Sequence, residues 1–186
     1  MSSKNKFYFI KGTKVYLRPF KLKDISKKYL KWLNNPEINY GIEARFPVSE
    51  LEAKNFFKET QGLKSKILFA ICDIKSNKHI GNCLISNIDW INRRCRYGRL
   101  IGEKNKRKKG IGTEVTKLIQ EIVFNKLNLN TMFTGSNETN IASIKSNLNA
   151  GMKKEGVSRE AIYINGKYYN QINFAITKKD FLKKRK

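Results

Sequence analysis

The sequence is poor in the residues that build metal centres, disulfides and membrane spans. Its 186 residues include three cysteines, three prolines and one histidine. Cys72, Cys83 and Cys95 lie in strand-like runs, without the paired spacing of a zinc site or a disulfide framework. No apolar run approaches the roughly 20 residues of a membrane span, and the first residues lack the apolar core of a secretion signal. We therefore expect a cytoplasmic protein with free thiols, no metal and no membrane association.

Acidic residues are also scarce, with 15 against 39 basic ones, which gives a net charge of +24. Such an excess raises nucleic acid as a partner. The lysines, however, are spread from end to end, and no zinc-finger spacing, aromatic RNA-sheet signature or basic zipper accompanies them. We favour a solvated lysine surface over a specific nucleic-acid site, and keep a basic nucleic-acid-binding protein without enzymatic activity as the alternative of another class.

The apolar periodicity predicts a single α/β domain over residues 1–186, with short basic tails at 1–12 and 182–186. The expected order is one strand, two helices, three strands, a helix, a strand, a helix and two strands. Short connections between the three consecutive strands make them antiparallel. The fold expected is a mixed, mostly antiparallel central sheet flanked by helices. The strands are predicted at 14–19, 66–73, 79–89, 94–101, 131–136, 161–164 and 167–177, and the helices at 24–33, 49–57, 114–127 and 140–150.

Local signals set several boundaries. Asp24 is expected to cap the first helix and Pro36 to end it. Ser49 with Glu52 forms a capping box for the second helix, and Asn165-Gly166 is a strong hairpin turn signal. A surface turn is expected for His79, and the helical spacing of Phe56 and Phe57 predicts core positions for both.

The stretch from Arg107 to Thr113 (RKKGIGT) is the most informative part of the chain. It follows a strand-like run and precedes a helical one, and Gly110 and Gly112 allow close approach of an anion to the backbone. Exposed N–H groups at such a helix start hold phosphates. The third glycine of the dinucleotide fingerprint and the Gly-Lys-Ser/Thr of the nucleotide triphosphate loop are both missing. The stretch therefore predicts a diphosphate-binding loop.

This loop resembles the acetyl-CoA loop of the GNAT superfamily of N-acetyltransferases, Gln/Arg-x-x-Gly-x-Gly/Ala, with Arg107, Gly110 and Gly112 in the pattern positions. Asn140 and Gly151-Met152 reproduce the spacing of the next helix in that superfamily. From about Thr13 to Phe181, the chain is similar to the branch of ribosomal-protein alanine, amino-sugar and spermidine acetyltransferases. The resemblance implies a single GNAT-like domain and acetyl-CoA as co-substrate, bound by Ile101, Arg107, Lys108, Lys109, Gly110, Ile111, Gly112, Thr113, Asn140 and Ser143.

The resemblance also implies a strand 94–101 that splays from its neighbour and frees backbone donors for the thioester oxygen. Gly98 is either part of this splay or a sheet kink without function. The usual strand Glu is Arg96 here, so Glu103, Asp89 and Glu43 remain as candidate general bases.

The usual helix Tyr, which protonates the leaving thiolate, is Asn147 in this chain, and Ser143 matches the Ser used in the ribosomal-protein branch. The alternative is that Ser143 only satisfies the exposed N–H groups of the first helical turn, which is the usual role of a serine at this place.

The acceptor is expected to contact the loop 39–46 and the last hairpin, with Glu43, Arg45 and Tyr168 as candidate substrate-binding residues. The favoured acceptor is the primary amine of an amino sugar, nucleotide-linked, or of another small molecule. The alternative is the N-terminus of a protein, notably a ribosomal one. Spermidine ranks lower because a cationic surface repels polyamines. A homodimer is compatible with the sequence.

Overall fold

The computed structural model describes residues 7–39, 41, 46–62 and 65–183. They form an eight-stranded sheet of order β1-β2-β3-β4-β5-β6-β8-β7, in which only the β5–β6 pair is parallel. The expected mixed, mostly antiparallel sheet is confirmed. The strands are β1 (Ile10–Lys11), β2 (Val15–Pro19), β3 (Ile67–Asp73), β4 (His79–Asp89), β5 (Arg94–Ile101), β6 (Thr131–Asn137), β7 (Lys153–Ile164) and β8 (Lys167–Thr177).

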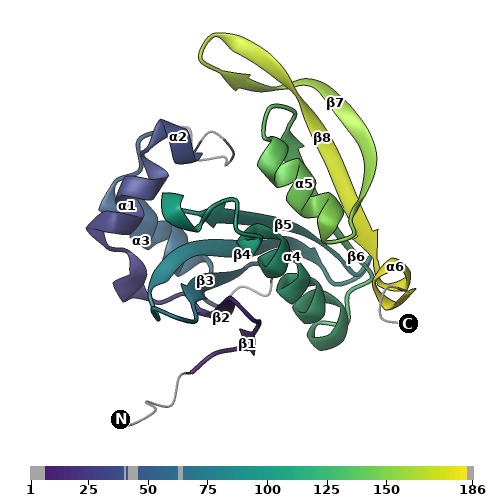
Figure 1. Ribbon diagram of the computed structural model, residues 1–186, viewed down its shortest axis with the longest axis horizontal. Helices are drawn as coiled ribbons and strands as arrows, with labels where there is room; N and C mark the ends of the chain where they lie inside the picture. Colours follow the sequence, from purple (N-terminus) through teal and green to yellow (C-terminus); the bar gives the residue numbers. More distant parts are fainter. Residues whose placement is uncertain (1–6, 40, 42–45, 63–64, 184–186) are drawn as a thin grey trace.

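Helices cover both faces of the sheet because its strands alternate between two apolar sets (Figure 1). One face packs against α1 (Lys27–Leu33), α2 (Pro36–Asn39) and α3 (Glu50–Glu59). The other packs against α4 and α6, with α5 beside α4. These three helices are α4 (Ile111–Glu121, continued by a π-helix at Ile122–Lys126), α5 (Ile141–Asn149) and α6 (Lys178–Lys183).

The sheet opens at its only parallel pair. Strand β5 pairs with β6 from Arg94 to Arg96, opposite Thr131 to Phe133, and no further. Beyond that point β5 stays on β4 as far as Ile101, whereas β6 stays on β8 as far as Asn137. The two strands therefore diverge, as the resemblance implied, and leave a gap between them that α4 and α5 border (Figure 1).

Both boundaries of the first helix differ from the prediction. Asp24 does not cap α1: its carboxylate accepts two hydrogen bonds from the Arg18 guanidinium, at 2.6 and 2.7 Å. A bidentate, partly buried pair of this kind is stronger than an exposed cap. Ser26 caps α1 instead, at 3.3 Å from the Tyr29 N–H. Pro36 opens α2 rather than ending α1, because a first helical position needs no N–H donor.

The prediction of a surface turn for His79 was wrong. The residue begins β4, and its ring lies 5.8 Å from that of Phe20, 6.2 Å from Tyr29 and 5.3 Å from Trp32. Burial in this aromatic cluster lowers the pKa of His79. The helical pattern correctly placed Phe57 against the core, but Phe56 is 36% exposed and lines a groove described below.

Other local predictions are confirmed. Ser49 and Glu52 form the capping box, with hydrogen bonds of 3.2 and 2.6 Å. Asn165 and Gly166 have positive φ angles of 49° and 80°, as a two-residue hairpin turn requires. The three cysteines are buried free thiols, and burial raises the pKa of Cys95 to about 12.

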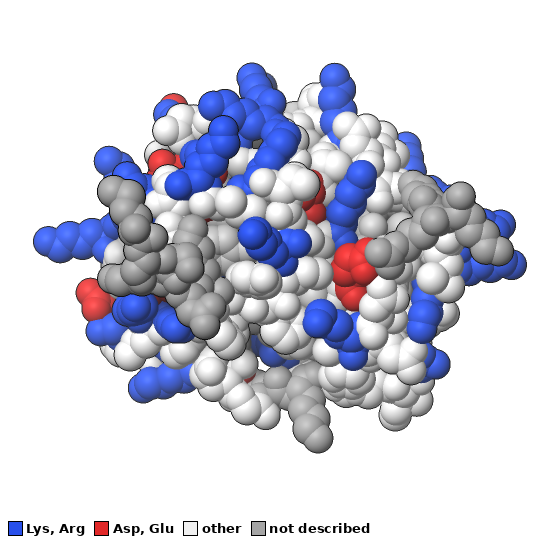
Figure 2. All heavy atoms as spheres, turned by 60° about the horizontal axis from the view of Figure 1, so that its bottom comes forward, with Lys and Arg blue, Asp and Glu red and all other residues white. Residues whose placement is uncertain are grey.

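On the face drawn in Figure 2, the basic side chains of the described residues are spread over several elements rather than gathered in one patch. Within the described part of the chain, no helix is long and apolar enough to cross a membrane. The same residues contain no cluster of His, Cys, Asp and Glu side chains that could hold a metal ion.

Candidate active site

The glycine loop forms an open helix start. After a 3₁₀ turn (Lys104–Lys106), the chain enters α4 at Ile111, three residues before the predicted beginning of the helix. The N-cap is Gly110, which has φ 76° in the left-handed region and no side chain to bond the first-turn N–H groups. These N–H groups and the positive end of the helix dipole are therefore available to an anion. The structure fits the predicted diphosphate loop.

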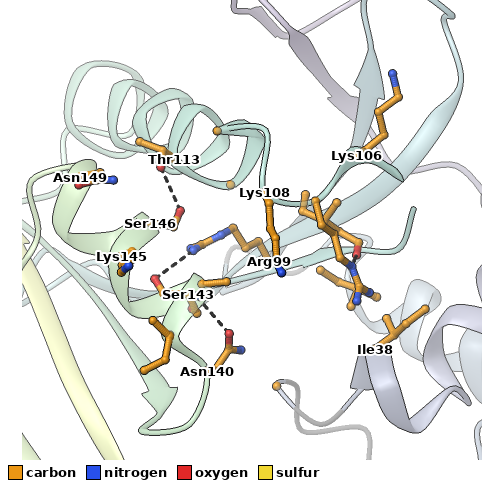
Figure 3. A pocket seen from close by; sticks show the side chains of 18 residues that line it. Ile38, Arg99, Lys106, Lys108, Thr113, Asn140, Ser143, Lys145, Ser146 and Asn149 are labelled. Atoms are coloured by element: carbon orange, nitrogen blue, oxygen red, sulfur yellow. Dashed lines mark hydrogen bonds between the residues drawn. The ribbon is translucent and has the colours of Figure 1, made fainter. Parts of the chain in front are cut away.

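A cavity of about 710 Å³, called the cofactor cavity, lies beside this helix start, between the ends of β5, α2 and α5 (Figure 3). Most of the predicted cofactor residues line it, namely Ile101, Arg107, Lys108, Gly110, Gly112, Thr113, Asn140 and Ser143. Two do not. Ile111 is buried in the core under α4, and the carbonyl of Lys109 accepts a hydrogen bond from the Lys14 ammonium at 2.7 Å. The helical phase of α4 turns Ile111 away from the cavity, whereas Lys109 precedes the helix.

Arg107 closes one side of the cavity. Its Nε donates to the Ile101 carbonyl at 3.0 Å, and its Nη1 donates to the Glu37 carbonyl at 3.3 Å. The side chain therefore links the loop to both β5 and α2. A guanidinium in this position retains donors for an anionic ligand, because it carries five N–H groups.

The opening between β5 and β6 supplies backbone groups to the same cavity. The Gly102 N–H donates to the Ile80 carbonyl at 3.0 Å, so Gly102 bonds toward β4. Because backbone direction alternates along an antiparallel ladder, Arg99 and Ile101 direct their backbone groups away from β4, toward the opening. The pantetheine arm of coenzyme A carries amides that fit such an exposed strand edge. The loop, the cavity and the opened strand thus fit this cofactor together.

A second cavity, of about 580 Å³, lies on the other side of the opening and is called the acceptor groove here. It lies between helices α1 and α3 on one side and strands β4, β5 and β6 on the other. The two cavities meet at four residues that line both of them, namely Gly41, Arg99, Leu100 and Ser143. A thioester carbonyl at this junction would belong to a cofactor bound in the first cavity and could be reached by an amine from the acceptor groove. The groove is lined further by Tyr29, Leu33, Phe46, Pro47, Val48, Glu52, Ala53, Phe56, Asn82, Leu84, Ser86, Asn87, Arg96, Tyr97, Gly98, Thr134 and Gly135.

Asn140 and Ser143 are in the positions that the resemblance implied. The Asn140 Oδ1 caps α5 by accepting from the Ser143 N–H at 3.1 Å, and Asn140 also lines the cofactor cavity. The Ser143 side chain points elsewhere: its Oγ lies 2.9 Å from the Ser136 Oγ. Ser143 is therefore not the residue that caps the first turn, because Asn140 does this through its side chain.

The candidate bases Glu103 and Asp89 are not brought to either cavity. Glu103 forms an ion pair with Lys28 at 2.6 Å, and Asp89 accepts from Asn92 in the β4–β5 turn at 2.7 and 2.8 Å. Tyr168 lies near the tip of the β7–β8 hairpin, 64% exposed, with its ring tilted by 55° against that of Tyr163 at 5.0 Å. The remaining candidates, Glu43 and Arg45, lie outside the described residues.

Gly98 is not a kink. Its pairing with Leu84 continues the regular β4–β5 ladder, whose register shift lies between Ser86 and Asp89. A β-carbon built on Gly98 meets no atom within 4 Å and points into open space on the groove floor. The glycine therefore keeps the groove open.

The comparisons with known proteins agree with this geometry. The Acetyltransferase (GNAT) domain family matches residues 14–153. A spermidine N-acetyltransferase from Vibrio cholerae, solved in complex with CoA and spermine, superposes with a TM-score of 0.82 at 20% identity, over 91% of this chain and 98% of that one. A GNAT-family acetyltransferase from Bacillus anthracis superposes with a TM-score of 0.78 at 18% identity, over 91% and 98% of the two chains. A search of curated proteins found no significant match.

The chain therefore belongs to the GNAT family of acetyltransferases, whose domain spans most of its length. It is an acetyl-CoA-dependent N-acetyltransferase that acts on an amine. The predicted family, fold class and co-substrate are confirmed.

Sequence reasoning missed Arg99, Ser136 and Glu52 as residues of the site. Glu52 was read only as part of the capping box, a role that it keeps while it lines the groove. Arg99 projects from the α4 face of β5 and hydrogen-bonds to α5, 48 residues away. No local sequence pattern predicts such a contact. The one available signal is a charged residue in an otherwise half-buried strand, because a charged side chain there needs a partner.

Proposed function

We propose that the acceptor is the primary amine of a small, hydroxyl-bearing molecule, in the first place an amino sugar, including a nucleotide-linked one. The charge of the acceptor groove carries this proposal. Among its described lining residues, two are arginines, Arg96 and Arg99, of which Arg99 turns its guanidinium to α5, and one is an acid, Glu52. Polar uncharged side chains complete the wall and can bond sugar hydroxyls, namely Asn82, Ser86, Asn87 and Thr134.

The single acid is a poor general base. Glu52 accepts the Ser49 N–H at 2.6 Å in the helix cap, and this bond, followed by the one with the Ser49 side chain, lowers the pKa of its carboxyl. A carboxylate with a lowered pKa attracts a proton less strongly. An alkylammonium with a pKa near ~10 would remain almost wholly protonated at neutral pH. Electron-withdrawing hydroxyl and ring oxygen neighbours lower the pKa of an amino-sugar amine, so that more of it is already neutral.

The same charge pattern disfavours a polyamine acceptor. The Vibrio cholerae enzyme was solved with spermine, but the fold that it shares does not carry its acceptor over at 20% identity. A polyamine carries several positive charges and needs several carboxylates along its path. The described part of the groove presents the Arg96 side chain instead, while the Arg99 guanidinium lies on the other face of β5 against α5. The whole protein has a net charge of +24. Like charges at this range repel.

Acetyl transfer then needs little from the protein. The neutral amine enters from the groove and attacks the thioester carbonyl at the junction with the cofactor cavity. Backbone donors of the opened β5 edge stabilise the developing oxyanion, an effect that is typically worth a few kcal/mol. The C–S bond breaks with its electron pair on sulfur, and the proton released by the acetylated nitrogen reaches the thiolate through water.

A panel of amines tests the proposal. Free and nucleotide-linked amino sugars, spermidine and an N-terminal ribosomal-protein peptide would each be incubated with acetyl-CoA, and the products measured by mass spectrometry with thiol release. We expect kcat/KM for the best amino sugar to exceed that for spermidine and for the peptide by about tenfold or more, which corresponds to roughly 1.4 kcal/mol. A clear preference for spermidine or for the peptide would refute this assignment.

A further inference from the structure

A chain of three hydrogen bonds leads from a cation to the junction of the two cavities. Arg99 Nη1 donates to Asn147 Oδ1 at 2.9 Å, Asn147 Nδ2 donates to Ser136 Oγ at 3.2 Å, and Ser136 Oγ lies 2.9 Å from Ser143 Oγ. Figure 3 shows Arg99 extending between α4 and α5 toward Ser143. Asn147 is fully buried and Ser136 is 5% exposed, so water does not compete for these bonds. Three elements, β5, α5 and β6, supply the four side chains.

The polarity of the first two bonds is fixed by chemistry. A guanidinium has donors only, so the atom of Asn147 that faces Arg99 must be the amide oxygen. The NH₂ group of Asn147 then faces Ser136 and can only donate. Ser136 Oγ therefore accepts a hydrogen bond and still has its own hydrogen to place.

The third bond follows from the cost of an unpaired buried donor. If Ser143 donated to Ser136, the hydroxyl hydrogen of Ser136 would need another acceptor, and none is found for it in the described part of the chain. An unsatisfied buried donor costs about 1–3 kcal/mol. The favoured arrangement is thus Ser136 donating to Ser143. The hydrogen of Ser143 then points away from Ser136, and Ser143 lines both cavities.

We propose that Arg99, Asn147 and Ser136 are positioning residues, which orient the Ser143 hydroxyl as a hydrogen-bond donor to the sulfur of the departing coenzyme A. Asn147 occupies the place where the usual residue is a Tyr that protonates the thiolate. A titrating acid is thereby replaced by an oriented hydroxyl. This inference rests on the proposed acetyl transfer and deepens it by naming the residues that serve the leaving group.

The step balances without a transferred Ser143 proton. The amine nitrogen forms a bond to the carbonyl carbon, the C–S bond breaks, and its electron pair goes to sulfur. Ser143 stabilises this negative sulfur through a charge-assisted hydrogen bond and keeps its proton. The thiolate finally takes, through water, the proton that the acetylated nitrogen loses. The products are an N-acetyl amine and free coenzyme A thiol.

The thiol pKa of bound coenzyme A tests the relay without any acceptor. Coenzyme A would be titrated in complex with the protein, and thiolate formation followed by ultraviolet absorbance. A donor aimed at sulfur lowers this pKa below that of the free thiol. We expect Ser143→Ala to raise the bound thiol pKa by about 1 to 2, the equivalent of losing one charged hydrogen bond. Ser136→Ala should raise it by at least about 0.5, because the donor loses its orientation.

A double-mutant cycle separates orientation from general damage. If Ser136 acts through Ser143, then Ser136→Ala changes nothing further in a Ser143→Ala background. Ser158→Ala is the matched control, since Ser158 Oγ also accepts from an Asn amide, that of Asn173 at 2.9 Å, outside both cavities. The control should leave the thiol pKa unchanged. An effect of Ser136→Ala that persists undiminished without Ser143, or that equals the control, would overturn the relay.

Asn147→Asp is a second variant in case Ser136→Ala does not fold. The introduced carboxylate accepts a hydrogen bond from Arg99 but cannot donate one to Ser136. Ser136 would then donate to that carboxylate and accept a hydrogen bond from Ser143, so that Ser143 no longer points its hydrogen at the sulfur. Asn147→Asp would be measured with Ser143 present and in the Ser143→Ala background. The rise in thiol pKa that remains without Ser143 is due to the new charge, and the rise that is lost is due to the relay. An equal rise in the two backgrounds would refute the relay. Calorimetry with coenzyme A separates the two proposals: failure of the wild-type protein to bind overturns both, whereas binding with a thiol pKa equal to that of free coenzyme A overturns the relay alone.

Discussion

Replacing Gly98 should make the protein more stable and less active at the same time. Gly98 lies in the middle of β5 on the groove floor, outside the left-handed backbone region. A β-carbon there meets no atom within 4 Å, so alanine has room, and the longer side chain of leucine would extend from this point into the groove. Their side chains would occupy space that belongs to the acceptor. Fold and function therefore respond in opposite directions.

The magnitudes follow from the two environments. Gly→Ala at a compatible position typically stabilises by about 0.4–1 kcal/mol, because the unfolded chain has fewer conformations. For a domain of this size, that corresponds to a rise in Tm of about 1–4 °C. Gly98→Leu, which fills the groove floor, should weaken acceptor binding by about 1–3 kcal/mol, which corresponds to a roughly 5- to 150-fold lower kcat/KM. Coenzyme A affinity should not change, because Gly98 does not line the cofactor cavity.

The assay combines thermal unfolding, coenzyme A calorimetry and acetyl transfer to the best amine of the panel. Gly156→Ala is the matched control: it also meets no atom within 4 Å, and it lies on β7, outside both cavities. It should raise Tm without changing kinetics. A lower Tm for Gly98→Ala would show that Gly98 shapes the strand. Unchanged acceptor kinetics for Gly98→Leu would show that the amine does not enter through this groove.

Three further results are expected. Gly110→Glu should abolish coenzyme A binding with the fold retained in circular dichroism, because it places a side chain at a φ of 76° and a negative charge at the anion site; undiminished binding would refute the loop assignment. Arg107→Ala should weaken coenzyme A binding about tenfold in calorimetry, because a charged hydrogen bond and the link to Glu37 are lost; an equal dissociation constant would contradict this. Asp73 is largely buried, which opposes ionisation, but hydrogen bonds from Lys106 and Ser76 prevail and lower its pKa to about 2. The ionised Asp73 therefore stabilises the fold at pH values above 3.8, the pKa of the carboxyl in the unfolded chain. Asp73→Asn should lower Tm at pH 7, and the difference in Tm from the wild type should shrink between about pH 4 and pH 2. A difference in Tm that does not depend on pH would exclude the ion pair as its source.

Features encoded within a few residues were predictable from the sequence. The turn from the glycine loop into a helix, the capping box at Ser49 and the Asn165-Gly166 turn each depend on the backbone preferences of adjacent residues, and the structure contains all three. Asp24 and His79 were misplaced because their environments are tertiary. Arg18 on β2 competes for Asp24, and helix α1 folds over His79.

The candidate site was predictable only in its cofactor half. Phosphate binding uses consecutive backbone groups, so its signal is contiguous in sequence. The acceptor groove and the relay join β4, β5, β6, α1, α3 and α5, and no spacing rule connects such elements. Ser143 was found through resemblance alone. Its partners Arg99 and Ser136 emerged only from the geometry, at sequence separations of 44 and 7 residues.

Two departures from the family pattern have one chemical consequence. Arg96 stands where a strand Glu is usual and Asn147 where a helix Tyr is usual, so both titrating groups are lost together. Glu52, with its lowered pKa, is the one acid, and no histidine is present, among the described residues that line the cavities. The rise of kcat/KM with pH should then follow the amine pKa of each acceptor rather than an ionisation of the protein. Two amino sugars of different amine pKa would show two different inflections, and a shared inflection between pH 6 and 8 would reveal a protein base and sink the argument.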